Sequence, residues 1–216
     1  MPDFLPYSPE KAGTLSDLTG DIFPSTFTRW DGSALLPPDA SHFLYIEEDT
    51  IIQFAGRAHE AAAGMYLSLP GEVGIQSGRG IATSRHGYNS FFLLGGPVEE
   101  FGRLRYIDGC TDSLLIPPVT LGDPCLNLLH IPPHTEQTRH THPSFRTGII
   151  ISGSGECVTP DGCHALTPGL AFLIPANAAH SFHTSDEALR VIAFHPDSDF
   201  GPTDETHPMV NRTIIE

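Results

Sequence analysis

Basic side chains are scarce in this sequence, which has 11 lysines and arginines against 26 aspartates and glutamates and a formal net charge of −15. A chain this acidic repels the phosphate backbone of nucleic acids and the anionic headgroups of lipids. No helix-turn-helix segment is present, and no apolar stretch approaches the length that spans a bilayer. We therefore expect neither a nucleic-acid partner nor a membrane partner.

Cysteine is also rare, and the N-terminus lacks a basic segment followed by an apolar one. The second absence predicts a cytoplasmic protein. In a reducing compartment, four thiols without C-x-x-C spacing are expected to be free: Cys110, Cys125, Cys157 and Cys163. Cys157 and Cys163 flank a turn, but an ordinary hairpin register pairs each of them with a different residue.

Long amphipathic helical patterns are missing as well. The 20 prolines and 21 glycines are scattered and separate many short apolar runs, which is typical of strands. With 216 residues the chain is long enough to bury a large core. These features predict an all-β protein.

Three histidines carry the clearest chemical signal. His140 and His142 are two residues apart, so on a strand both side chains project to the same face, and His180 follows a strand-like run that ends at Pro175. Three imidazoles that converge can hold one divalent metal ion. The alternative is a barrel that keeps the three histidines but has lost its metal.

The spacing around these histidines resembles the two motifs of the cupin family. The first motif, Gly, five residues, His-x-His, three or four residues, Glu, six residues, Gly, fits the frame from His134 to Gly153, and the second fits at Gly169, Pro175, Asn177, His180 and Thr184. The resemblance implies a cupin double-stranded β-helix, or jelly-roll barrel, with either a β-rich N-terminal extension or a degenerate second cupin half. Asn177 stands where the family has Gly, and Asn tolerates the left-handed conformation that such a turn requires. His134, also at a family Gly, is expected to reshape only a loop.

Arg146 stands where the family places a metal-binding Glu. On a strand that runs from His140, Arg146 faces the same side as the histidines. Three neutral imidazoles donate no negative charge, and at about 6 Å with an effective dielectric constant near 20 each unit of like charge costs roughly 3 kcal/mol. We therefore expect an anionic ligand, a carboxylate, between the metal and Arg146, with Ser144 or Thr147 as candidate hydrogen-bond partners. Two alternatives stay open: an ion pair between Arg146 and Glu136, or Glu136 as the replacement metal ligand.

The first half of the chain predicts less. We assign residues 1–40 to an N-terminal arm with a short helix near Thr14–Asp17, 41–122 to a β-rich half, 123–197 to the metal-binding core and 198–216 to a C-terminal tail. A weak repeat relates 102–110 to 155–163 with an offset of 53 residues. If a second barrel exists, it lacks His-x-His and has no comparable metal site.

The resemblance implies a mononuclear non-haem iron dioxygenase that acts on a small carboxylate, with Fe(II) as the expected metal and zinc, nickel, manganese or copper as alternatives. Arg146 would bind the substrate, and family habit suggests a homodimer. Two other functions stay open: a non-catalytic cupin that binds a small molecule or metal, and a metal-dependent lyase or isomerase.

Overall fold

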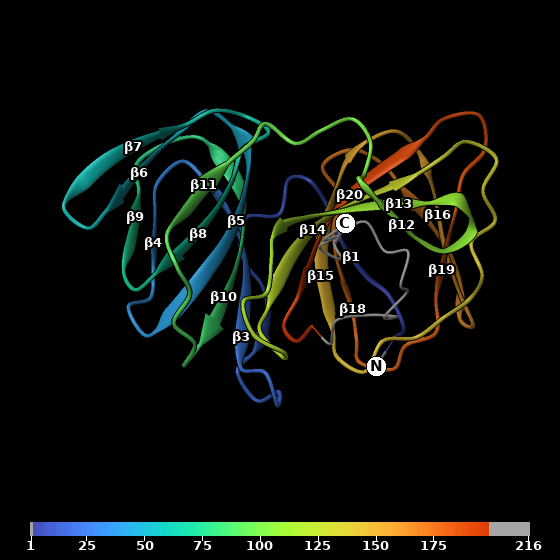
Figure 1. Ribbon diagram of the computed structural model, residues 1–216, viewed down its shortest axis with the longest axis horizontal. Helices are drawn as coiled ribbons and strands as arrows, with labels where there is room; N and C mark the ends of the chain where they lie inside the picture. Colours follow the sequence, from blue (N-terminus) through green and yellow to red (C-terminus); the bar gives the residue numbers. More distant parts are fainter. Residues whose placement is uncertain (1, 199–216) are drawn as a thin grey trace, which may run out of the picture.

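A computed structural model describes residues 2–198 and contains two β-barrels that lie side by side (Figure 1). The all-β prediction is confirmed. Within 2–198 the only helical element is the 3-10 turn η1 (Ile107–Gly109), and no helix there is long and apolar enough to cross a membrane. The short helix predicted near Thr14–Asp17 is wrong, because these residues belong to a strand that pairs with β3 (Ser25–Asp31) and buries Leu15.

The N-terminal barrel consists of a six-stranded and a four-stranded sheet. The six-stranded sheet has the order β11-β8-β5-β10-β3-β2 and the four-stranded sheet the order β4-β9-β6-β7. Their bounds are β2 (Gly13–Leu18), β3 (Ser25–Asp31), β4 (Ala34–Leu36), β5 (Ala40–Glu48), β6 (Thr50–Phe54), β7 (Arg57–Ala61), β8 (Tyr66–Pro70), β9 (Val73–Ile75), β10 (Arg79–His86) and β11 (Leu93–Gly95).

The C-terminal barrel has the same design, with a seven-stranded sheet of order β1-β18-β15-β20-β14-β13-β12 and a three-stranded sheet of order β17-β16-β19. Three of its strands precede residue 123, and one of these, β1, comes from the start of the chain. The bounds are β1 (Leu5–Tyr7), β12 (Leu104–Arg105), β13 (Thr111–Ile116), β14 (Cys125–Ile131), β15 (Arg146–Ser152), β16 (Gly155–Thr159), β17 (Gly162–Leu166), β18 (Ala171–Ile174), β19 (Ser181–His183) and β20 (Leu189–His195).

The two halves repeat each other with an offset that the sequence did not reveal. The hairpin β6–β7 spans 50–61 and the hairpin β16–β17 spans 155–166, so equivalent ends are 105 residues apart. The predicted offset of 53 residues does not relate the two barrels. Segment 102–110 contains β12 and η1, and β12 forms a hairpin with β13. The alternative of a second barrel half, rather than a simple extension, is the one the structure has.

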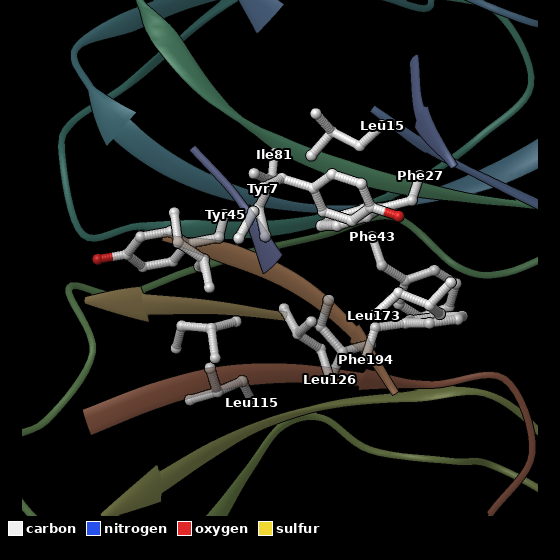
Figure 2. Close-up of a cluster of buried hydrophobic side chains, with 14 of the residues drawn as sticks. Tyr7, Leu15, Phe27, Phe43, Tyr45, Ile81, Leu115, Leu126, Leu173 and Phe194 are labelled. Carbon is white, nitrogen blue, oxygen red and sulfur yellow. The ribbon is translucent and has the colours of Figure 1, made fainter. Parts of the chain in front are cut away.

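The barrels pack through their large sheets. One apolar cluster draws side chains from both, and Phe43 of β5 meets Phe194 of β20 with ring centroids 4.9 Å apart (Figure 2). Beside this cluster, the buried hydroxyl groups of Thr83 and Thr147 hydrogen-bond across the interface at 2.7 Å. Side chains of β14, β15 and β20 that point to this cluster alternate with side chains that point into the C-terminal barrel.

The N-terminal segment ties the barrels together. β1 adds to the C-terminal sheet through β18, with Leu5 opposite Leu173. The buried Arg29 of the other barrel donates hydrogen bonds to the carbonyl oxygens of Ser8 (2.9 Å), Pro9 (3.1 Å) and Gly169 (2.5 Å). Of the predicted tail 198–216, only Ser198 lies within the described residues.

All four cysteines are free, as predicted. In the β16–β17 hairpin, Cys157 pairs with His164 and Cys163 with Val158. The register therefore separates the two thiols in the predicted way.

Candidate metal centre

His140 and His180 face each other across an isolated antiparallel bridge. Each donates its backbone N–H to the other's carbonyl oxygen at 3.0 Å. Directly opposed residues project their side chains to the same face, and the two imidazole centroids are 4.6 Å apart. His140 was predicted on a continuous strand, but β15 begins only at Arg146, so this bridge does the positioning instead.

His142 completes the group. Its ring centroid lies 5.0 Å from that of His140 and 5.2 Å from that of His180. Its carbonyl oxygen accepts a 2.7 Å hydrogen bond from the backbone N–H of Asn177, which fixes the loop. One ligand nitrogen from each histidine lies within 4.8 Å of the others, and 2–198 contains no other such group of histidine, cysteine or acidic side chains.

The hydrogen bonds of the histidines suit a metal. His140 Nδ1 lies 2.8 Å from the carbonyl oxygen of Thr138, and His180 Nδ1 lies 2.9 Å from that of Ala178. A carbonyl only accepts, so both Nδ1 atoms carry the proton and both Nε2 lone pairs are available as ligands. This arrangement fits the donor set that a divalent ion takes from imidazoles.

Burial keeps His142 and His180 neutral. It lowers the pKa of His180 to about 4, and the positive charges of His140 and Arg146 add to the shift. Burial also lowers the pKa of His142 to about 2, with Arg146 as the next cause. Neutral imidazole is the form that coordinates a metal.

Arg146 is buried beside this group and begins β15. Its Nη1 donates to the carbonyl oxygen (3.1 Å) and the hydroxyl group (2.8 Å) of Ser144. The same atom donates to the carbonyl oxygen of Phe145 (2.9 Å), and together these bonds fix the guanidinium. The next residue, Thr147, points to the N-terminal barrel, so alternation directs Arg146 into the C-terminal barrel. The predicted direction of Arg146 agrees with this geometry.

The alternatives involving Glu136 fit the structure poorly. Glu136 is exposed, and its backbone forms a bridge with His183, whereas the ion pairs among residues 2–198 do not join it to Arg146. It is also absent from the group that could hold a metal. Of the two candidate ligand contacts, Ser144 lies at Arg146, but Thr147 bonds Thr83 at the interface.

The two non-glycine residues at family glycine positions have the backbone that glycine favours. Asn177 has φ 61° and His134 has φ 59°. The left-handed turn predicted at Asn177 is confirmed. His134 is exposed, and its backbone N–H donates to Ser185 at 2.7 Å, so it shapes a loop.

Sequence reasoning missed several polar residues of this barrel. His195, at the end of β20, has its ring centroid 6.3 Å from that of His142, and burial, then Arg146, lowers its pKa well below the usual value. Tyr106 lies edge-on to His140 at 6.5 Å. Burial raises the pKa of Asp112 to about 7, although Asn127 Nδ2 donates to its carboxylate at 3.2 Å. The alternation along β20 was the one signal that could have placed His195.

Comparisons with known proteins agree with the barrel architecture. A family model described as "Cupin domain" matches residues 127–195. No curated protein matches the chain. Among solved structures, a Cupin 2 conserved barrel domain protein from Leptotrichia buccalis is 11% identical, with a TM-score of 0.59, 79% of this chain covered and 82% of the other.

Two further structures extend over most of both chains. A salicylate 1,2-dioxygenase from Pseudaminobacter salicylatoxidans is 12% identical, with a TM-score of 0.60 and coverage of 85% and 75%. Protein Ylba from E. coli is 14% identical, with a TM-score of 0.59 and coverage of 91% and 84%. Identities this low relate the folds alone. Residues 127–195 thus match a cupin domain, and the chain shares its barrel fold with these structures.

Proposed function

We propose that the protein is a metal-dependent cupin oxidoreductase, a mononuclear iron dioxygenase whose substrate is a small carboxylate. The observation that carries the proposal is the convergence of His140, His142 and His180, with ligand nitrogens within 4.8 Å of one another, beside the buried Arg146. The similarity in fold to a salicylate 1,2-dioxygenase supports the reaction class. A cytoplasmic homodimer remains the expected state.

The three imidazoles would hold the metal, and backbone carbonyls already set the ring orientations of His140 and His180. Ferrous iron at such a site would supply one-electron chemistry with oxygen and open coordination positions for a substrate. The positive charge of Arg146 would attract the carboxylate of the substrate. The hydrogen bonds of Nη1 to Ser144 and Phe145 hold the guanidinium in place.

The first test is elemental mass spectrometry on untagged protein purified without added metal or chelator. We expect about one iron per chain, loss of that iron in His142→Ala, and retention in His59→Ala, a control in β7 of the other barrel. Full occupancy in His142→Ala would refute the assignment.

The second test concerns substrate class. Benzoate is expected to bind the metal-loaded protein more tightly than its neutral amide, and Arg146→Gln should reduce the difference; equal affinity in the wild type would refute the carboxylate. Oxygen uptake is then screened with small carboxylic acids. Turnover that persists under nitrogen would support the metal-dependent lyase or isomerase. Binding without turnover would support the non-catalytic cupin.

A further inference from the structure

A row of inward-pointing residues crosses the large sheet of the C-terminal barrel. Gly148 of β15 lies opposite Ala193 of β20, which lies opposite Asn127 of β14. Their sequence neighbours Thr147, Ile192 and Leu128 face the N-terminal barrel, so this row faces the interior. Arg146 is two positions before Gly148 and points the same way.

Two buried acceptors at the far end of this row have no donor. Asn127 is 7% exposed, and its Nδ2 is used by Asp112 Oδ2 at 3.2 Å. Asn127 Oδ1 and Asp112 Oδ1 are both buried, and no residue in 2–198 donates a hydrogen bond to either. A buried acceptor left without a donor costs about 1–3 kcal/mol, so two adjacent ones indicate that a donor arrives from outside the protein.

These acceptors share an environment with the candidate metal centre. Burial is the main cause that raises the pKa of Tyr106, which stacks edge-on to His140; Asp112 adds to the shift and Arg146 opposes it. The pKa of Cys125, opposite His195 in the sheet, is likewise raised by burial and then Asp112, and lowered by Arg146. Asp112 and Arg146 therefore act on the same interior groups.

The spacing suits one small ligand. β14 and β15 are separated only by β20, which puts Asn127 about 10 Å from Gly148 across the sheet, and Arg146 is two residues, about 7 Å, further along β15. The small side chain of Ala193 lies between Gly148 and Asn127 in the row, and the ring of Phe172 lies against Gly148, where a Cβ would meet it at 2.5 Å. A cation therefore stands at one side of the interior and two hydrogen-bond acceptors at the other.

We propose that Asn127 and Asp112 form a ligand subsite that accepts a hydrogen bond from a hydroxyl or amino group of the molecule bound at the metal centre. The substrate class becomes a small carboxylate that carries an O–H or N–H group remote from its carboxylate. The carboxylate end rests on the proposed function; the donor end rests only on Asn127 and Asp112.

The test uses rigid probes that differ only in the donor. 3-Hydroxybenzoate and 3-fluorobenzoate are titrated into protein as purified, and so are the neutral methyl 3-hydroxybenzoate and methyl 3-fluorobenzoate, because fluorine is close to a hydroxyl in size but cannot donate. In each pair the hydroxyl compound should bind at least tenfold more tightly, and Asn127→Leu should abolish the preference. Equal affinities within both pairs, or a preference that survives in Asn127→Leu, would overturn the subsite.

A measurement on the unmodified chain guards against a folding defect in the variant. The carboxyl ¹³C resonance of Asp112, identified by its absence in Asp112→Asn, should shift with methyl 3-hydroxybenzoate and stay in place with methyl 3-fluorobenzoate. Identical spectra with both would also overturn the subsite. The comparison of the carboxylates with their neutral esters tests the proposed function separately, so the two failures are distinguishable.

Discussion

The two barrels differ in the side chains at one pair of opposed segments beside their small sheets. In the N-terminal barrel β4 pairs with β9, and Leu36 lies opposite Val73; both are buried in an apolar cluster. In the C-terminal barrel the segment before β15 pairs with the segment at β19, and His140 lies opposite His180. The same strand order thus supports an apolar interior in one barrel and a cluster of imidazoles in the other.

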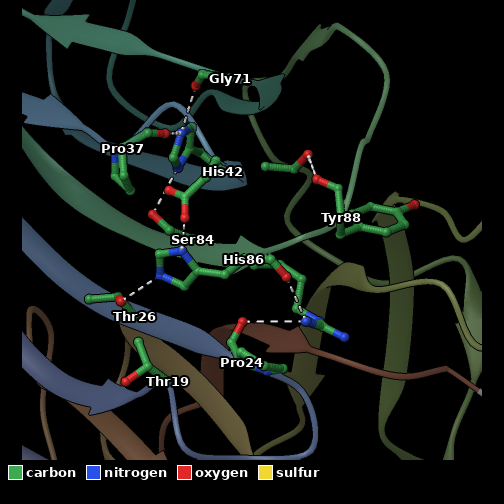
Figure 3. Close-up of polar contacts among 12 residues, drawn as sticks. Thr19, Pro24, Thr26, Pro37, His42, Gly71, Ser84, His86 and Tyr88 are labelled. Atoms are coloured by element: carbon green, nitrogen blue, oxygen red, sulfur yellow. Dashed lines mark hydrogen bonds and ion pairs between the residues drawn. The ribbon is translucent and has the colours of Figure 1, made fainter.

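A buried histidine in each barrel shows what separates a structural imidazole from a candidate ligand. Burial lowers the pKa of His42 to about 4, as it does for His180, so the pKa does not distinguish them. Both ring nitrogens of His42 are in contact with protein acceptors or hydroxyls: Nδ1 with Ser84 at 2.8 Å, and Nε2 with the carbonyl oxygens of Gly71 (2.8 Å) and Pro37 (3.1 Å) (Figure 3). In His180 the carbonyl of Ala178 occupies Nδ1 and leaves the other nitrogen for a metal.

The largest expected effect tests this distinction directly. His180→Ala should weaken metal binding by on the order of a thousandfold, because one of three ligands is lost. His42→Gln should leave the affinity unchanged. Competition with a chromophoric chelator measures both, and a similar loss in His42→Gln would show that the barrels do not differ in this way.

A second experiment asks whether the barrels are separate folding units. Phe194→Ala should cost about 3–5 kcal/mol, because Phe194 is buried in the cluster that joins the large sheets. Trp30 is the single tryptophan and is buried in the N-terminal barrel, so its fluorescence reports that barrel, whereas far-ultraviolet circular dichroism reports both. Both signals should shift together to lower denaturant. An unchanged tryptophan transition would contradict coupling, and Phe101→Ala, at 56% exposure, is the control.

The pH dependence of stability tests the role of the buried His42 in the N-terminal barrel. The folded pKa of His42 is about 4 against an ordinary value of 6.5, so as the pH falls below 6.5 the unfolded chain takes up the proton first and stability is lost until about pH 4. This loss amounts to about 3 kcal/mol and should disappear in His42→Gln. Urea unfolding at a series of pH values measures it. The exposed His134, replaced by Asn, is the control, and an unchanged slope in His42→Gln would contradict the assignment.

The smallest effect concerns the hydroxyl pair between the barrels. Thr83→Val or Thr147→Val alone leaves one buried hydroxyl without its partner and should cost about 1–3 kcal/mol. The double variant should cost less than the sum of the single variants, since neither hydroxyl then remains. Additive costs in a double-mutant cycle would show that the two hydroxyls do not interact.

Local patterns predicted those parts of the site that depend on local backbone. The two-residue spacing of His140 and His142 and the turn at Asn177 are short-range features, and the structure has both close to His180. The direction of Arg146 followed from alternation, although the strand begins six residues later than expected. Alternation is a property of extended backbone and persists when strand ends are misjudged.

The parts of the fold and site that were not predicted depend on which strands pair. Pairing between distant segments leaves little trace in one sequence. Thr14–Asp17 was expected to be helical, but pairing with β3 overrides the local preference. Asp112 and Asn127 look like ordinary polar residues until β13 and β14 pair and turn both side chains inward. The 105-residue repeat is preserved in strand order and not in residue types.

The pairing of β1 with β18 has a consequence for biosynthesis. Leu5 leaves the ribosome long before its partner Leu173 is made. At about 5–20 residues per second, β1 waits on the order of ten seconds or more for its partner strand. β1 is therefore made before the rest of its sheet but docks late, and its arrival closes the edge of the barrel that contains the histidines.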